Sequence, residues 1–132
     1  MIRRPPRSTQ SRSSAASDVY KRQWLDSFPD LVAGKMVALI ERGAPRDFRD
    51  IHALCHAGLV TSEHCWALWR RRRQLAGSDT DQARARLAIE THLARIEQHR
   101  PLTDIENVSA RVQAEKVRTW FREVFLNVNA VD

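Results

Sequence analysis

The residues best suited to chemistry lie in one short stretch of the sequence, GKMVALIERGAPRDFRDIHAL, from Gly34 to Leu54. Lys35 and Arg42 are seven positions apart, so they share one face of a helix. Asp47 and Asp50 are three apart and share a face of the next helix. A lysine ammonium is a mobile point charge suited to phosphate, and a carboxylate can hold a metal-bound water or accept a proton from a hydroxyl group. These charges could therefore form a site for a charged ligand.

The same charges also have a purely structural explanation. Asp47 falls in the first turn of its helix, where the helix dipole favours an acid. Arg46 and Asp50 are spaced as an i,i+4 pair, which contributes only ~0.3–0.5 kcal/mol. Lys35 can extend its stem along an apolar helix face and keep its charge in water. The residue types alone leave both interpretations open.

The elements that must position these charges are two helices joined by Gly43, Ala44 and Pro45, which predict a helical hairpin. At ~1.5 Å rise per residue, Lys35 and Asp50 lie about 12 Å and about 7.5 Å from this turn. The two charges are therefore expected at similar heights on opposite helices.

The rest of the chain also has a helical pattern, and no segment alternates as a strand would. The apolar spacing, capping residues and glycine stops predict an all-α bundle of about five helices. These helices are expected from about Pro29 to Gly43, from Pro45 to about His56, from Thr61 or Ser62 to Gly77, from the Ser78–Asp81 segment to about Arg100, and around Val112, Val117, Trp120, Phe121, Val124 and Phe125.

Residues 1–23 differ from the remainder in composition. They hold six of the 22 basic residues and one of the 16 acidic residues, without any apolar period. Met1–Thr9 and Ser13–Gln23 resemble the translated halves of a sequencing adapter. We interpret 1–23 as a non-native disordered segment and 24–132 as the domain. Without 1–23 the net charge falls from +6 to +1, with 16 basic and 15 acidic residues, so the high pI does not indicate nucleic-acid binding.

The remaining residues place few constraints on the class of protein. Two cysteines make no disulfide framework, and neither a signal peptide nor an apolar run of membrane length is present, which predicts a cytoplasmic protein without a membrane contact. Five nominal zinc ligands lie close together, but their spacing fits no zinc motif, so no metal site is predicted here. These ligands are His52, Cys55, His56, His64 and Cys65.

A second basic feature is the run of four arginines, Arg70, Arg71, Arg72 and Arg73, which follows Trp66 and Trp69. Aromatic and basic side chains together can grip RNA. Consecutive residues step about 100° around a helix, however, so the run cannot form one flat patch. The structural alternative is a helix anchored by core tryptophans and ending in cations that its dipole favours.

The stretch from Gly34 to Leu54 resembles the C-terminal motifs of the AbiEii/AbiGii-type nucleotidyltransferase toxin family. In that family a helix with the pattern K-x-x-A-L-x-x-R leads through a short turn into R-D-x-x-D. The matching residues here are Lys35, Ala38, Leu39, Arg42, Arg46, Asp47 and Asp50. The resemblance implies that Lys35 lies near nucleotide phosphates and Asp50 near the catalytic centre. Arg42, Arg46 and Asp47 would be supporting residues.

The resemblance also implies what the helices belong to. They would form the C-terminal portion of a nucleotidyltransferase-superfamily α/β protein that transfers a nucleotidyl group from an NTP to an acceptor, such as tRNA or a protein, with Mg²⁺. A separately encoded antitoxin would be a partner. The family's metal-binding D-x-D, preceded by G-S, has no counterpart before Lys35. We therefore expect a missing N-terminal core, no metal site in this chain, and a fragment inactive alone.

Two other functions remain as alternatives. A small helical nucleic-acid-binding or regulatory module would use Arg46, Arg49 and Arg70–Arg73 without catalysis. A purely structural helical domain would use none of these charges for a ligand.

Overall fold

The computed structural model describes residues 27–128, and the part described is all-α, as predicted. No strand occurs within these residues. The adapter-like segment predicted over 1–23 lies outside the described residues. Between residues 27 and 128 there are five α-helices, α2 (Phe28–Glu41), α3 (Pro45–His56), α4 (Ser62–Leu75), α5 (Gln82–His99) and α6 (Val108–Glu123), and two short 3-10 helices, η2 (Leu102–Asp104) and η3 (Phe125–Asn127).

Local sequence explains where three of these helices begin. The side chains of Thr61, Asp81 and Asn107 each accept a hydrogen bond from a backbone N–H three residues later, at 3.1, 3.2 and 2.9 Å. Such caps satisfy backbone donors that have no partner inside the helix. A proline in the first turn starts both α2 and α3.

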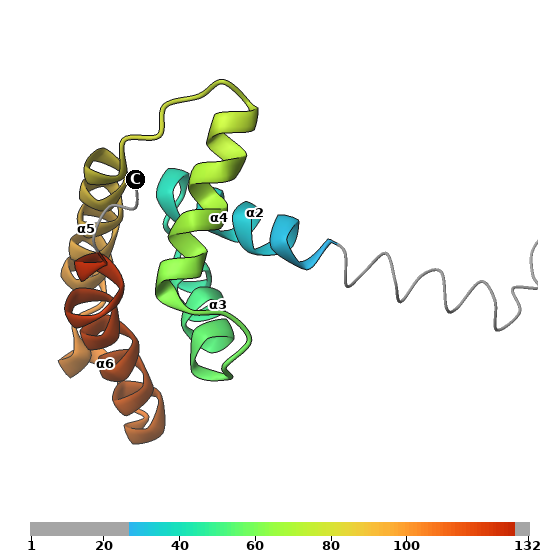
Figure 1. Ribbon diagram of the computed structural model, residues 1–132. Helices are drawn as coiled ribbons and strands as arrows, with labels where there is room; N and C mark the ends of the chain where they lie inside the picture. The colour runs from blue at the N-terminus through green and yellow to red at the C-terminus, as the bar shows by residue number, and fades with distance from the viewer. Residues whose placement is uncertain (1–26, 129–132) are drawn as a thin grey trace, which may run out of the picture.

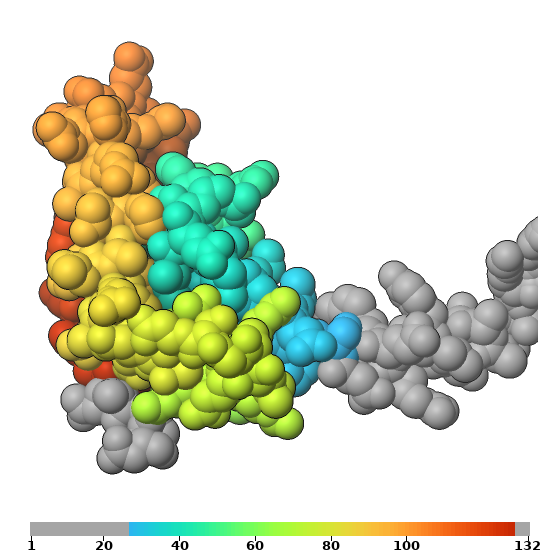
Figure 2. Space-filling model, turned by 90° about the horizontal axis from the view of Figure 1, so that it is seen from above, coloured from blue at the N-terminus to red at the C-terminus, as the bar shows by residue number. Residues whose placement is uncertain are grey.

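The helices form two groups, as Figure 1 shows: α5 and α6 lie side by side, and α2, α3 and α4 lie next to them. Helix α2 packs on α4, α3 and α5, and α3 packs on α6. In the space-filling view from above, the yellow-green surface of α4 borders the blue surface of α2 (Figure 2). Helix α2 is therefore in contact with three others, and residues on its exposed side have neighbours on α3 and α4.

The core is rich in aromatic residues. Trp66, Phe121 and Phe125 are almost fully buried, and burying a side chain of this size contributes about 1.5–3 kcal/mol. The indole Nε1 of Trp66 donates to the carbonyl oxygen of Phe125 at 3.1 Å. This bond ties α4 to the segment that follows α6.

Val112 and Val124, two apolar residues by which the last helix was predicted, are 43 % and 46 % exposed, and Leu31 of α2 is 41 % exposed. Leu31 borders a surface groove formed by α2, α3 and α4. Val112 lies five positions before the buried Val117, about 140° around the helix. Val124 follows the last residue of α6. Apolar type alone did not predict burial at these positions.

No helix within residues 27–128 is both long enough and apolar enough to cross a lipid bilayer.

Candidate active site

The turn between α2 and α3 is fixed by close backbone contacts. The carbonyl of Ala38 accepts hydrogen bonds from the backbone N–H groups of Arg42 and Gly43, at 2.8 and 3.0 Å. Gly43 has φ +60°, a conformation that glycine adopts without steric cost. A Cβ atom at this position would lie 2.2 Å from Cγ of His92 on α5. The turn therefore requires glycine both for its backbone angle and for its approach to α5.

Arg42 and Asp47 form a two-pronged ion pair across this turn. Nε and Nη2 of Arg42 donate to the two carboxylate oxygens of Asp47 at 2.9 and 2.7 Å, and the backbone N–H of Ala44 donates to the same carboxylate at 2.9 Å. Asp47 is only 5 % exposed. The Arg42 hydrogen bond holds the pKa of the Asp47 carboxyl below its ordinary value, against the opposing effect of burial. The carboxylate of Asp47 therefore serves to hold the turn.

Lys35 and Asp50 form the second ion pair between the two helices. Nζ of Lys35 donates to Oδ2 of Asp50 at 3.1 Å. Their side chains are 33 % and 46 % exposed, so a ligand can reach both groups. A partly exposed pair of this kind contributes about 0–1 kcal/mol to stability. Exchanging this contact for a ligand would therefore cost little.

The partner of Asp50 differs from the one that spacing suggested. Arg46 and Asp50 are placed as an i,i+4 pair, but Asp50 pairs with Lys35 of the neighbouring helix. No salt bridge of Arg46 occurs within residues 27–128. The exposed guanidinium of Arg46 therefore remains available for a ligand.

These charges line an open groove of about 560 Å³ on the surface of α2, α3 and α4. Lys35, Arg42, Arg46, Asp47 and Asp50 all border it, so the structure brings together all the residues that the motif assigned to a site. Asp30, Leu31, Gly34, Ala38 and Arg72 complete its lining.

Arg72 is the groove residue whose place sequence reasoning missed. Its Nη1 donates to the carbonyl of Asp30 at 3.2 Å and lies 3.3 Å from where a Cβ of Gly34 would be. Gly34 thus leaves space for the guanidinium to cross α2. A glycine inside an apolar helix is one weak signal of this contact, but no sequence pattern links it to an arginine of α4.

The other members of the arginine run point in different directions, as helical geometry requires. Arg71 is exposed, and Arg73 donates through Nε to the carbonyl of Asp79 at 2.8 Å. Nη1 of Arg70 is buried without a hydrogen-bond partner within residues 27–128. The run does not form one basic patch, and only Arg72 borders the groove.

The histidine and cysteine segment lies apart from the groove. The rings of His52 and His56 stack with centroids 5.5 Å apart, and burial together with the charge of His56 lowers the pKa of His52. The sulfur atoms of Cys55 and Cys65 are 3.9 Å apart. Within residues 27–128, no three His, Cys, Asp or Glu side chains are arranged to hold a metal ion.

One lysine, three arginines and three aspartates line the open groove of this helical bundle, so basic residues exceed acidic ones by one. Such a groove is suited to binding a phosphorylated ligand. The comparison with protein families agrees with this class. The family described as "Nucleotidyl transferase AbiEii toxin, Type IV TA system" matches residues 24–123, and the chain belongs to this family. Searches among curated proteins and among solved structures found no match.

The family match spans every residue of the groove, from Asp30 to Arg72. It confirms the family inferred from the Lys35 to Asp50 motif and supports membership of a toxin–antitoxin system with a separate antitoxin. The individual roles of Lys35, Arg42, Arg46, Asp47 and Asp50 stay predictions. So do the division at residue 23 and the expected N-terminal core.

Proposed function

We propose that the groove between α2, α3 and α4 holds the phosphates of a nucleoside triphosphate during nucleotidyl transfer. The observation that carries this proposal is the Lys35–Asp50 pair, which joins the two motif helices at 3.1 Å and stays open to solvent. Arg46 and Arg72 border the same groove from two other directions. A triphosphate offers several anionic oxygens, which is more charge than the single carboxylate of Asp50 gives Lys35.

Lys35 is the primary phosphate-binding residue in this proposal. Its flexible stem allows the ammonium to move from Asp50 to a phosphate oxygen without moving α2. Arg42 cannot make this exchange as readily, because two of its nitrogen atoms, Nε and Nη2, donate hydrogen bonds to Asp47 that hold the turn. Arg42 and Asp47 are accordingly positioning residues.

Asp50 becomes free when Lys35 moves to the phosphate. Its carboxylate can then accept the proton of an acceptor hydroxyl. The hydroxyl oxygen forms a bond to the α-phosphorus, the bond from this phosphorus to the β-phosphate oxygen breaks, and pyrophosphate leaves. One ion pair thus supplies both an electrostatic contact for the substrate and a proton acceptor.

Magnesium is the cofactor that nucleotidyl transfer implies, and it requires several carboxylate or other oxygen ligands. Asp47 is occupied by Arg42 and by the Ala44 N–H, and the other carboxylates that line the groove are Asp30 and Asp50. No set of three metal-ligating side chains exists within residues 27–128. The described residues do not fit a complete magnesium site. Our proposal therefore places the metal ligands outside them, in the α/β core that the family resemblance implies.

We further propose RNA as the acceptor, with a protein acceptor as the alternative. Arg46 is exposed beside the groove, and Arg72 is exposed on α4 next to it, so an RNA end that enters would meet two guanidinium groups. A nucleic-acid-binding module without catalysis would use the same arginines, but it gives no role to Lys35 and Asp50.

The test is nucleotide binding by the 132-residue chain, measured by isothermal titration calorimetry with ATP, GTP, CTP and UTP in turn. The variant Lys35→Met should weaken binding of the preferred nucleotide about tenfold or more, because a charge-assisted hydrogen bond is lost. Lys116→Met is the matched control, since Lys116 is an exposed lysine on α6. Equal affinities for the two variants would remove Lys35 from the site.

Transfer itself requires a protein that also carries the metal-binding carboxylates. In such a protein, Lys35→Ala and Asp50→Ala should each abolish transfer and leave the helical circular dichroism spectrum unchanged. Retained transfer by both variants would contradict the proposed roles.

A further inference from the structure

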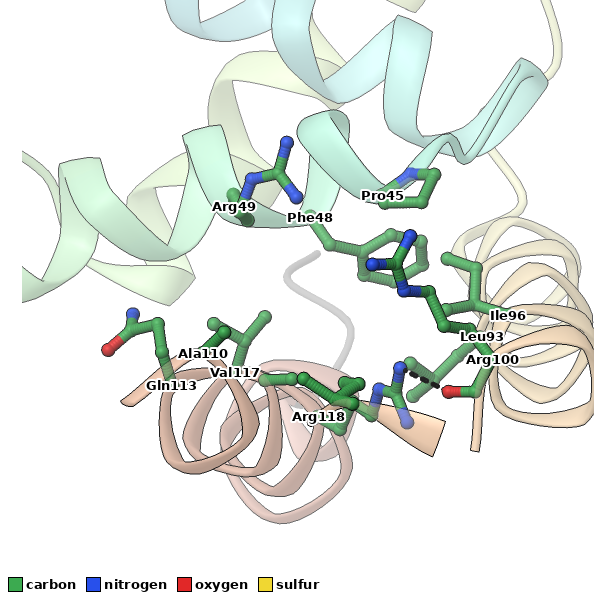
Figure 3. Close-up of a pocket in the computed structure, with 12 residues that line it drawn as sticks. Pro45, Phe48, Arg49, Leu93, Ile96, Arg100, Ala110, Gln113, Val117 and Arg118 are labelled. Carbon is green, nitrogen blue, oxygen red and sulfur yellow. Dashed lines mark hydrogen bonds between the residues drawn. The ribbon is translucent and has the colours of Figure 1, made fainter. Parts of the chain in front are cut away.

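A second cavity lies on the other side of α3, between α3, α5 and α6, and has a volume of about 280 Å³ (Figure 3). Helix α3 therefore separates two sites: Arg46, Asp47 and Asp50 border the groove, whereas Phe48 and Arg49 border this pocket. Nothing in the proposed nucleotide chemistry uses the pocket.

The body of the pocket is apolar. Phe48 and Leu93 are 2 % exposed and Val117 is 5 % exposed, so these side chains form a firm apolar wall. Ile96, Ile105 and Ala114 add further carbon surface. Ligand-binding pockets typically combine such a lining with a few converging polar groups.

The charged groups that line the pocket are arginines, and Gln113 of α6 is a further polar residue of the lining. Arg49 of α3, Arg100 after α5 and Arg118 of α6 come from three different elements, and Figure 3 shows all three around the pocket. No acidic residue is among those that line it. None of the three guanidinium groups forms a salt bridge within residues 27–128.

Arg118 is the most unusual of the three because it is 7 % exposed. Its Nη2 donates to the carbonyl oxygen of Arg100 at 2.9 Å, which satisfies one of its five donors but does not neutralise its charge. Burial, and then the charge of Arg100, lower the pKa of Arg118. A buried cation without an acid is costly, and a bound anion would remove that cost.

We propose that this pocket binds a small amphipathic anion, whose carboxylate or phosphate head pairs with Arg49, Arg100 and Arg118 while its alkyl or aromatic body packs on Phe48, Leu93 and Val117. The volume limits the body to a short chain or a single ring system. The three arginines select for the charged head, and the apolar wall selects against a bare inorganic ion.

The test uses the ¹⁵N-labelled 132-residue chain, titrated in separate series with octyl phosphate, octanoate, octanol and inorganic phosphate and followed by two-dimensional NMR. Octyl phosphate or octanoate should shift the amide signals of the pocket residues in a saturable manner. Whichever of these two ligands binds more tightly shows whether the preferred head group is a phosphate or a carboxylate. Octanol and inorganic phosphate should each bind about tenfold more weakly, since each lacks one half of the recognition.

Three variants of pocket residues and one control variant locate the contacts. Arg49→Gln and Arg100→Gln alter exposed residues, so folding is preserved, and each should weaken octyl phosphate binding several-fold. Arg71→Gln removes the same charge from an exposed position of α4 and should leave the affinity unchanged. Ala114→Leu fills the pocket and should abolish binding.

Lys35→Met should not change the affinity for octyl phosphate, which separates this pocket from the nucleotide groove. Octanol binding as tightly as octyl phosphate would overturn the proposal, because the arginines would then have no role. Binding that survives Ala114→Leu would overturn it as well, since the ligand would lie elsewhere.

Discussion

Lys35 of α2 and Asp50 of α3 are joined by a 3.1 Å hydrogen bond although fifteen positions separate them in the sequence. The neighbouring pair, Arg42 and Asp47, joins the same two helices but is more tightly bonded, and its carboxylate is buried. One pair therefore holds the hairpin together, and the other remains open to solvent. This difference in burial is the basis for assigning Arg42 and Asp47 to structure and Lys35 and Asp50 to ligand chemistry.

The Asp47→Asn variant should lower the free energy of unfolding by about 1–3 kcal/mol at neutral pH, because the Arg42 guanidinium and the Ala44 N–H lose a charged acceptor. The pKa of Asp47 is lowered in the folded protein, so its stabilising contribution is present above the pKa of the unfolded chain and is lost as pH falls through the folded value. Urea denaturation at several pH values measures this effect.

The difference between Asp47→Asn and the unchanged protein should consequently shrink at acidic pH. Asp104→Asn, at an exposed position of η2, is the control and should change the free energy of unfolding little at any pH. A difference that stays constant from neutral to strongly acidic pH would show that the carboxylate charge is not the stabilising feature.

Gly43→Ala should be more destabilising than Gly77→Ala, although both glycines have a positive φ, of 60° and 67°. A left-handed backbone costs a residue with a Cβ roughly 1–2 kcal/mol at either position. At Gly43 the added atom would also collide with His92, whereas at Gly77 no atom lies within 4 Å. The collision should add about 1–3 kcal/mol. Thermal unfolding of the two variants measures the difference. Equal losses of stability in both variants would contradict the close contact between the turn and α5.

Much of the fold could be predicted from the sequence because its signals are local. The prolines at the starts of α2 and α3, the caps at Thr61 and Asp81, and Gly43 each act within one turn of helix. The relation of Lys35 to Asp50 could also be predicted, since a short turn leaves the second helix little freedom.

Contacts between distant segments were not predictable in the same way. Arg72 meets Gly34 because α4 crosses α2, and this crossing depends on how the whole core packs. The pocket beside Phe48 requires α5 and α6 to bring Arg100 and Arg118 together. No local pattern connects these arginines to α3, so their convergence becomes visible only in the folded chain.

Cys55 and Cys65 should form a disulfide under mild treatment with hydrogen peroxide, because their sulfur atoms are 3.9 Å apart. The two thiols lose two hydrogen atoms as the S–S bond forms, and the peroxide is reduced to two water molecules. The hydrogen bond to Cys65 lowers the pKa of the half-buried Cys55, while that same bond and burial raise the pKa of Cys65. Cys55 is therefore expected to react first.

Mass spectrometry of the intact, non-reduced chain measures the loss of two hydrogens, and peptide mapping locates the bond. Cys55→Ser should prevent it. An oxidised product that contains only sulfinic or sulfonic acid at Cys55 would show that Cys65 cannot approach closely enough.

The central claim is that Lys35 exchanges Asp50 for a nucleotide phosphate, and two variants with opposite expected effects test it most directly. Calorimetric titration of the 132-residue chain with its preferred nucleoside triphosphate, in the presence of EDTA, isolates the contribution of the protein's own charges. Lys35→Met should weaken binding about tenfold or more. Asp50→Asn should tighten it by up to about fivefold, because the competing carboxylate is gone. Weakening of similar size in both variants would contradict the exchange and would instead indicate that the intact ion pair is a structural element of the groove.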